Sequence, residues 1–502
     1  MYRILILFLC LLTAPMLRGQ WAGVPDPSFG NGGMVCTDVN GFSDGYRAIE
    51  ELADGRILLA GYASAATSEQ AVIRAYYPDG SLDTGFSLQT ASLPLPPGMD
   101  IQAEDLLLLP GGDALVALHM ANGANGSLIL VRVDASGVRR TSFAGAGLLP
   151  ITKAGASLSD VRLAQGPGNT ILVAANVQQL GPASIMLSRF FEDGTPDRSF
   201  GTDGTRLLTY SGAGIQQTAL ATSHTGLIYV SGEVLTNPSS AAFILSLDVN
   251  GNIRSTFGAS GWFTPPASLG QVAIADLQLT SGGAPVFTGY ADQNGIRRMI
   301  AGRLSADGSP DLSFGNQGWY FAEAGQGIAW GTGLAETPEG GWVVTGGAYN
   351  GTNSDILVAW LDADGAPDTR IPGDGLVTLD LNGSNDRADA LYVRADGKVL
   401  LAGATETTNG YDLSLVRLLG PDQSTGFNAP EEDALQLRAS GSGIWIASSL
   451  RGNALVTDMG GRTLSNLSLN GDAVHVDLPR SGVYLVTLIH QKEKYSARVL
   501  IP

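Results

Sequence analysis

Short apolar runs separated by glycine-containing turns recur along most of the chain. Within residues 44–95, a stretch at 47–52 that contains Ala48, Ile49 and Leu52 is followed by Ala53-Asp54-Gly55 and then by the apolar run 57–61. Asp-Gly between two apolar runs is a strong hairpin signal, because the turn needs a positive φ that glycine adopts without steric cost. Two further extended stretches complete the unit, and no 3.6-residue apolar period is present. The pattern predicts antiparallel meanders of four short strands.

This unit repeats every 57 residues, and the period holds in several registers at once. Seven copies with almost no insertions are a specific sign of a repeat architecture. The aromatic register comprises Phe29, Phe86, Phe143, Phe200, Phe257 and Phe314, with Ile371 at the next step, and a turn glycine recurs at Gly80, Gly137, Gly194, Gly251, Gly308 and Gly365.

The second strand of each unit decides how the meanders assemble. It is apolar on consecutive residues, such as Leu58 and Leu59, which is typical of a strand buried on both faces. Small residues follow, as at Ala60. Four-stranded sheets covered on both faces by equivalent sheets are typical of propeller blades. A β-solenoid is the alternative, but its coils are usually roughly 20–30 residues long. We therefore expect an all-β protein with a seven-bladed β-propeller.

The two ends of the repeat region complement each other. The last copy stops at Phe427 without a following strand, whereas residues 34–39 form a surplus strand at the start. We expect this N-terminal strand to lie beside the strand containing Arg417 and to close the ring. Closure would remove the exposed sheet edges that otherwise promote aggregation.

Three segments of the chain differ in character. Residues 1–20 have the features of a signal peptide, with Arg3 before a short apolar core. Residues 21–429 contain the repeats. From residue 430 to 502 the period is lost, and alternating strands with glycine turns predict a small Ig-like β-sandwich. No later stretch reaches the roughly 18 apolar residues of a transmembrane helix, so no transmembrane segment is expected.

Composition excludes two classes of protein, disordered proteins and nucleic-acid-binding proteins. The chain has 502 residues, 44% of them hydrophobic and 15% charged, which is too apolar for disorder. With 29 Lys+Arg against 47 Asp+Glu and a net charge of −18, the chain lacks the basic surface that nucleic-acid binding needs. Loss of the signal peptide would leave Cys36 as a single thiol, so no intrachain disulfide is expected.

The motif around Ser309–Gly315 and Ala395–Gly403 resembles the delta-60 repeat family of β-propellers. The resemblance covers about residues 26–427, although Arg140 and Arg254 replace the usual Asp of the motif. It implies an extracellular or surface-exposed module without an established common activity.

The tail is similar to the sorting domain of the type IX secretion system of Gram-negative bacteria. The matching residues are Gly461 and Arg462 in one turn, and Gly482 and Tyr484 at a strand start. The resemblance implies that residues 430–502 bind the secretion machinery and that the protein is secreted or held at the outer-membrane surface. An Ig-like module that stays attached is the alternative.

One position of the repeat, at which the residue varies from copy to copy, is the candidate ligand-binding site; we call its seven residues the variable column. It directly follows Gly61 and its equivalents, ends the second strand, and changes from copy to copy where a purely structural position would stay uniform. Solvent-exposed strand ends are the alternative explanation. The column reads Tyr62, His119, Asn176, Glu233 and Tyr290, and then Gly347 and Ala404.

Catalytic and metal sites have weaker support. No histidine pair, zinc spacing or nucleophile elbow is present, so neither catalytic nor metal residues are assigned and no cofactor is expected. The run Asp362, Asp364 and Asp368 is similar to a calcium loop. Turn formation and pairing with a strand arginine, as between Arg303 and Asp311, are favoured instead. The related pairs are Asp307/Asp311, Asp193/Asp197 and Asp79/Asp83, and the recurring arginines are Arg74, Arg132, Arg189, Arg303 and Arg417.

These patterns together favour a secreted or cell-surface, non-catalytic binding module for an unknown extracellular glycan or protein. Two alternatives remain from the sequence: an extracellular carbohydrate-active hydrolase, and a calcium-stabilised adhesive or structural protein.

Overall fold

The computed structural model describes two stretches of the chain. The first is 22–421, apart from 87, 89–92, 94–97, 124, 237–239, 323, 325–326 and 372. The second is 436–501, apart from 441–442, 448–450, 459–461, 470–473, 479–481 and 491–492. The chain divides into two compact units, Trp21–Gln423 and Ser424–Pro502 together with Met1–Gln20.

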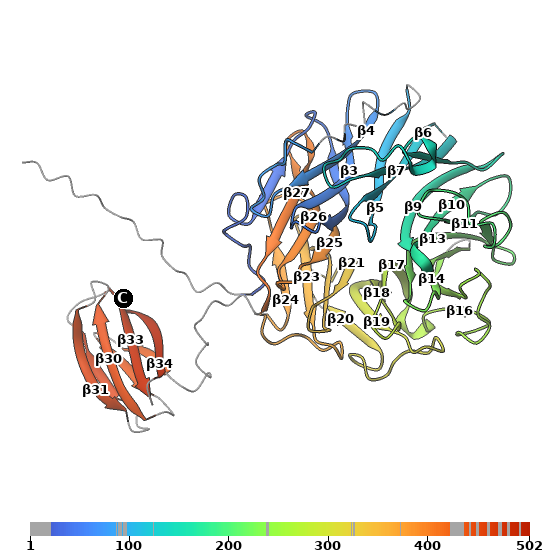
Figure 1. The fold of residues 1–502 in the computed structure, drawn as a ribbon. Helices are drawn as coiled ribbons and strands as arrows, with labels where there is room; N and C mark the ends of the chain where they lie inside the picture. The colour runs from blue at the N-terminus through green and yellow to red at the C-terminus, as the bar shows by residue number, and fades with distance from the viewer. Residues whose placement is uncertain are drawn as a thin grey trace, which may run out of the picture. The chain divides into compact units, whose positions relative to one another are not determined.

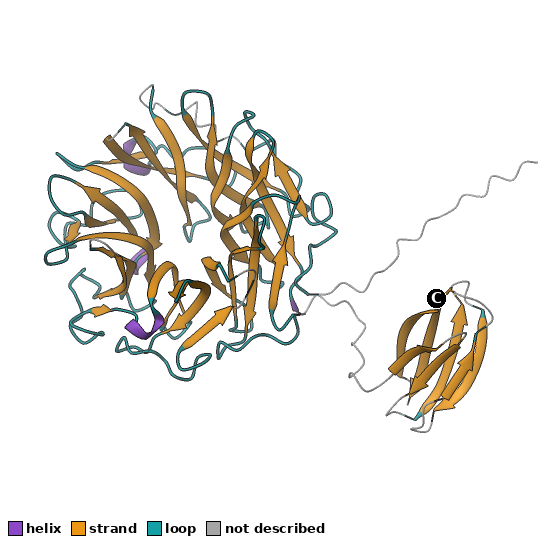
Figure 2. Ribbon diagram, turned by 180° about the vertical axis from the view of Figure 1, so that it is seen from behind, coloured by secondary structure: helices purple, strands orange, loops and turns teal. Residues whose placement is uncertain are grey.

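Seven sheets follow one another along the described part of the larger unit, and strands dominate it (Figure 2). Sheets 2 to 6 are meanders whose strands pair in chain order. The sheets are set around a common centre (Figure 1). Sheet 1 contains β2 (Asp44–Glu51), β3 (Ile57–Ser64) and β4 (Glu69–Tyr76); sheet 2 contains β5 (Asp100–Leu108), β6 (Ala114–Asn122), β7 (Asn125–Val133) and β8 (Leu148–Ile151); sheet 3 contains β9 (Ser157–Gln165), β10 (Ile171–Gln178), β11 (Ser184–Phe190) and β12 (Thr205–Leu208); sheet 4 contains β13 (Gly214–Thr222), β14 (Ile228–Leu235), β15 (Ser240–Leu247) and β16 (Trp262–Phe263).

Sheets 5 to 7 continue the same arrangement, and the short 3₁₀ helices η2 (Phe143–Gly145), η3 (Pro167–Asn169) and η4 (Ala267–Leu269) lie in loops. Within the described residues, no helix combines the length and apolar character needed to cross a bilayer. Sheet 5 contains β17 (Gln271–Leu279), β18 (Pro285–Gln293), β19 (Ile296–Arg303) and β20 (Trp319–Ala322); sheet 6 contains β21 (Ala329–Glu336), β22 (Trp342–Tyr349), β23 (Ser354–Leu361) and β24 (Leu376–Leu379); sheet 7 contains β25 (Asp386–Val393), β26 (Val399–Thr407), β27 (Gly410–Leu418) and β1 (Met34–Thr37).

The phenylalanine and the turn glycine that recur every 57 residues contact each other in the structure. A Cβ added at Gly365 would lie 2.6 Å from the ring of Phe314, and one at Gly251 would lie 2.7 Å from the ring of Phe200. Each turn glycine therefore packs on the phenylalanine of the preceding copy, and its positive φ makes the turn. This contact explains why the two columns share one 57-residue period.

The second strands are buried on both faces, as the consecutive apolar residues predict. In β3, Ile57, Leu58 and Leu59 are each at most 1% exposed. One cluster joins Phe29 and Ile57 to Leu400 and Leu415, so sheets 1 and 7 share a hydrophobic core.

The N-terminal strand pairs with the last strand of the larger unit. β1 runs antiparallel to β27, with Val35 opposite Leu415 and Met34 opposite Val416. Cys36 lies on β1 with its side chain exposed. Sheet 7 therefore takes its fourth strand from the opposite end of the repeat region.

The smaller unit has two sheets that share one core. Ile444 and Ile446 of the first sheet cluster with Val456 and Val486 of the second. The first sheet contains β28 (Gln436–Ser440), β29 (Gly443–Ala447) and β32 (Val474–Asp477), and the second contains β31 (Thr463–Leu469), β30 (Gly452–Asp458), β33 (Gly482–His490) and β34 (Glu493–Ile501).

The proposed sorting residues occupy different environments in this unit. Tyr484 is buried in β33, and Arg462 is exposed directly before β31. Gly482 is the first residue of β33. Gly461 lies outside the described residues.

Candidate ligand site at the central cavity

A β-bulge interrupts the first strand of each of the seven sheets described above. In sheet 1 the register shifts between Tyr46 and Ala48, which leaves Arg47 unpaired. A bulge adds one residue to a strand and re-aims a side chain. Six residues at this position line a cavity of about 420 Å³. They are Arg47, Glu104, Thr218, Ala275, Thr332 and Asp389.

The bulge also explains a glycine in the facing strand. A Cβ on Gly61 would lie 2.0 Å from the carbonyl oxygen of Gly45, which is a forbidden contact. Leu118 and Ala175 stand at this position in sheets 2 and 3. Equivalent contacts of 2.1 Å or less affect four further glycines, so the bulge accounts for the glycine in five of the seven sheets. These glycines are Gly232, Gly289, Gly346 and Gly403.

The cavity lining is acidic. Burial and the nearby carboxylate of Asp105 raise the pKa of Glu50 to about 8. Burial likewise raises the pKa of Asp105 to about 6, against the opposing charge of Arg162. An acidic cavity disfavours anionic ligands. The lining carboxylates belong to Glu50, Glu104, Asp105, Asp276, Glu336 and Asp389, and the lining guanidinium groups belong to Arg47 and Arg162.

Some of these carboxylates join neighbouring sheets. Asp105 of sheet 2 accepts the backbone N–H of Leu163 in sheet 3 at 2.7 Å. Asp276 of sheet 5 accepts the N–H of Leu334 in sheet 6 at 3.0 Å. Hydrogen bonds to the charged form stabilise a carboxylate that burial disfavours. These two groups therefore have a structural role between sheets.

Tyr62 is connected to the cavity through arginine. The guanidinium of Arg47 lies over its ring, 5.2 Å from the centroid, and Arg387 donates to its hydroxyl at 3.1 Å. Arg387 also pairs with the cavity residue Asp389 at 3.0 Å. A Cβ on Gly45 would lie 2.7 Å from Nη2 of Arg387, so this glycine makes room for the group.

His119 and Asn176 contact neighbouring strands. Nδ1 of His119 is 3.4 Å from Oε1 of the cavity residue Glu104. The side-chain oxygen of Asn176 accepts the backbone N–H of Gln217 in sheet 4 at 2.7 Å, and Asn176 is buried. His119 is thus held beside the cavity, whereas Asn176 fastens two sheets together.

The remaining members of the column lie at the same position in sheets 4 to 6. Glu233 is half-buried opposite Gln216, and Tyr290 carries the guanidinium of Arg297 over its ring at 4.0 Å. Gly347 has no room for a side chain because Trp330 covers it. None of the five predicted residues is among those that line the cavity in the described part of the chain. Sequence reasoning missed the bulge residues, although the facing glycines marked their position.

The predicted pairing of strand arginines with turn aspartates is confirmed for Arg303, whose Nε donates to Asp311 at 2.8 Å. Arg189 makes the same contact with Asp197 at 2.7 Å. Asp362 accepts the backbone N–H groups of Asp364 and Ala366, both at 2.9 Å. These carboxylates stabilise turns and balance arginine charges.

Comparison with known proteins supports a β-propeller. Residues 52–86 match the family model described as a domain of unknown function (DUF5122) β-propeller. No curated protein matches the chain.

Several solved structures show a distant likeness. PorZ of Porphyromonas gingivalis, a surface component of the type-IX secretion system, is 12% identical, with 91% of this chain and 81% of that chain covered and a TM-score of 0.22. Arabinanase Arb43A of Bacillus subtilis is 12% identical, with 54% and 96% covered and a TM-score of 0.34. The exo-β-1,3-galactanase 1,3Gal43A of Clostridium thermocellum is 12% identical, with 93% and 100% covered and a TM-score of 0.32. At TM-scores below 0.5, these likenesses say nothing about what the present chain does.

Proposed function

We propose that the protein is an exported, non-catalytic binding module. Its repeats form a seven-bladed β-propeller that β1 closes, and its ligand, an extracellular glycan or protein, binds at the mouth of the central cavity. One observation carries this proposal: the bulge residues differ from sheet to sheet, from Arg47 and Glu104 to Thr218 and Asp389, while the framework around them repeats. Variable side chains on a rigid scaffold are typical of binding surfaces.

The predicted column supplies the rim of this site. Tyr62 and His119 contact the cavity residues Arg47 and Glu104, and we assign Asn176, Glu233 and Tyr290 to the same rim by their equivalent positions. Because carboxylates outnumber guanidinium groups in the lining, a neutral or positively charged ligand is favoured over an acidic one.

Binding is tested with the full chain from residue 21 on a glycan array and against immobilised basic peptides. We expect retention without turnover, and a loss of affinity of at least about tenfold in R47A, since hot-spot arginines typically contribute more than 1 kcal/mol. R198A is the matched control, because Arg198 is an exposed arginine. Equal affinity of R47A and R198A would place the site elsewhere.

A hydrolase is the second candidate, and Glu50 is the observation that favours it. A half-buried carboxylic acid with a pKa of about 8 near a second carboxylate, Asp105, is the kind of pair that general acid catalysis of glycoside cleavage uses. Release of reducing sugar from array ligands, abolished in E50Q, would establish the enzyme. Retention of intact glycans supports the binding module.

We also propose that residues 1–20 are a signal peptide and that residues 430–502 form an Ig-like sorting domain for the type IX secretion machinery, which would place the protein outside the cell or on the outer-membrane surface. The separate core of the smaller unit supports an independent domain. Fusion of residues 424–502 to an exported reporter in a bacterium with this system tests the assignment. Surface delivery that R462A reduces is expected, and a reporter that stays in the periplasm would favour an attached Ig-like module.

A further inference from the structure

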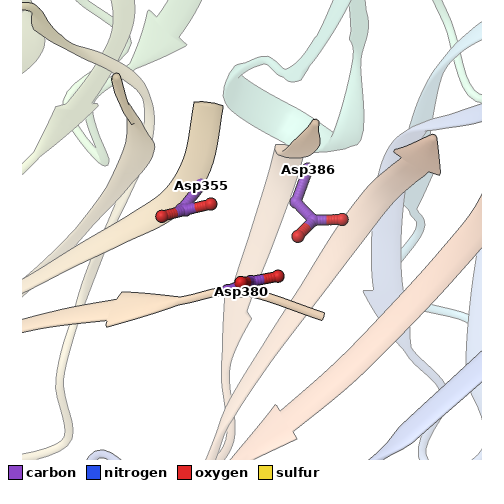
Figure 3. A group of neighbouring side chains, drawn as sticks. All are labelled: Asp355, Asp380 and Asp386. Atoms are coloured by element: carbon purple, nitrogen blue, oxygen red, sulfur yellow. The ribbon is translucent and has the colours of Figure 1, made fainter. Parts of the chain in front are cut away.

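Three aspartates from two consecutive sheets converge at one edge of the larger unit (Figure 3). Asp355 is the second residue of β23, Asp380 directly follows β24, and Asp386 is the first residue of β25. Ile356 pairs with Leu379, and this register brings Asp355 and Asp380 next to each other. Each of the three side chains contributes one oxygen atom to a group in which all separations are within 4.8 Å.

The group has buried negative charge that the described residues leave uncompensated. Asp386 and Asp355 are only 2% and 5% exposed, and none of the three aspartates forms an ion pair with a described lysine or arginine. Asp380 and Asp355 add to the effect of burial and raise the pKa of Asp386. A buried carboxylate without a positive partner is costly, so an additional cation would relieve a real electrostatic penalty.

One buried oxygen of the group has no donor among the described residues. Oδ2 of Asp355 accepts from Nδ2 of Asn350 at 2.9 Å, whereas its Oδ1 is buried and has no hydrogen-bond partner among the described residues. Figure 3 shows the carboxylate of Asp355 turned toward the other two. Buried polar atoms in native proteins are almost always satisfied, so an unpaired carboxylate oxygen at this point indicates a further partner such as an ion.

Three equivalent aspartates stand at the next junction between sheets, but their oxygen atoms do not all lie within 4.8 Å of one another as those of the first group do. Asp412, Asp38 and Asp44 are the equivalents of Asp355, Asp380 and Asp386 in the repeat. Oδ2 of Asp44 accepts the N–H of Val39 at 2.8 Å, and its Oδ1 is again buried without a partner. Burial, together with Asp38 and Asp412, raises the pKa of Asp44 to about 6.

Asp44 and Asp386 occupy the same position of the first strand in their repeats. The five remaining copies all have an apolar residue there. An aspartate with 2% exposure or less therefore replaces a core residue at two junctions only, which packing alone does not explain. The column reads Asp44, Ile101, Leu158, Ile215, Val272, Ala329 and Asp386.

We propose that Asp355, Asp380 and Asp386 bind a divalent cation, Ca²⁺, between sheets 6 and 7. Calcium takes oxygen ligands at about 2.3–2.6 Å, so two of its ligands can lie nearly 5 Å apart, as the oxygens of this group do. Carboxylates suit hard cations of this kind. The ion would fasten sheet 7 to sheet 6.

Isothermal titration and thermal unfolding of the full chain from residue 21, freed of metal with a chelator, test the proposal. We expect about one Ca²⁺ per chain and a melting temperature that rises with Ca²⁺ concentration, because a ligand that binds only the native state stabilises it. D386N and the double variant D44N/D386N should bind no ion, whereas D44N should bind one. D364N is the control, since Asp364 lies in an exposed turn, and it should also bind one ion.

The asparagine variants should also fold without metal. Removal of one charge relieves the repulsion within each group, so metal-free D386N should melt at or above the temperature of the metal-free parent. A parent chain that gives neither heat nor a melting shift at millimolar Ca²⁺ would overturn the proposal, as would a double variant that binds Ca²⁺ like the parent.

Discussion

Arg417 donates from Nε to Oδ2 of Asp26 at 2.9 Å across 391 positions of the chain. Arg303 makes the same contact with Asp311 at 2.8 Å, but these two residues are only eight positions apart in the chain. Arg417 also lies over Phe29, 4.5 Å from the ring centroid, and donates from Nη1 to the carbonyl of Pro78 in the turn after β4. The two ends of the repeat region thus reproduce the contacts of an interior repeat, and the edge of sheet 7 is covered.

Replacement of Asp26 should destabilise the larger unit strongly. Its carboxylate is 2% exposed and receives both Arg417 and Lys398, the latter at 2.9 Å. The variant D26A leaves buried cations unpaired, which typically costs about 3–5 kcal/mol. Urea unfolding measures the loss. D311A is the matched control and should cost about 1 kcal/mol, because its carboxylate is 28% exposed. Equal losses in the two variants would contradict a special role for the chain ends.

Glu50 should make stability fall as pH rises. Its pKa is raised by burial from 4.5 in the unfolded chain to about 8 in the native state, so the native state holds the proton more tightly. This contribution is complete below about pH 4.5 and is lost as pH rises through 8. E50Q should reduce the decline in unfolding free energy between pH 5 and 8 by roughly 1–3 kcal/mol. The exposed D203N variant should leave the profile unchanged, and an identical profile in E50Q would refute the prediction.

Gly61→Ala should be costly without adding any polar group. The new Cβ would meet the carbonyl of Gly45 at 2.0 Å, so the bulge must move. We expect a loss of about 3 kcal/mol, at the upper end of the cost of overpacking. Ala175 occupies the equivalent position in sheet 3, where the register shift spans Asp160 and Val161. Ala175→Gly should cost about 1 kcal/mol, and chemical unfolding of both variants compares them.

Removal of residues 424–502 should leave the larger unit intact. Contacts divide the chain after Gln423, and the smaller unit has its own core. Independent cores are expected to unfold independently. Calorimetry should show the transition of the larger unit within about 2 °C of its position in the full chain, since a change of 1 kcal/mol shifts melting by only a few degrees in large domains. A larger shift would show energetic coupling between the units.

Local patterns along the chain were enough to predict the repeat length, the four-stranded unit and the buried second strand, because hairpin turns and two-sided burial leave signals in Asp-Gly pairs and in runs such as Ile57 to Ala60. They also pointed to the pairing of Arg303 with Asp311, which are neighbours along the chain.

Which side chains face the cavity, and which acidic residues lie close together, became clear from the three-dimensional arrangement of the sheets. A bulge shifts the alternation of a strand by one residue, so Arg47 and Asp389 turn inward at positions that period-two reasoning does not mark. Asp355 and Asp386 belong to different sheets, and Asp44 and Asp412 stand at opposite ends of the repeats. Their proximity depends on how sheets pack around a common centre, and a linear pattern of apolar and polar residues does not contain that information.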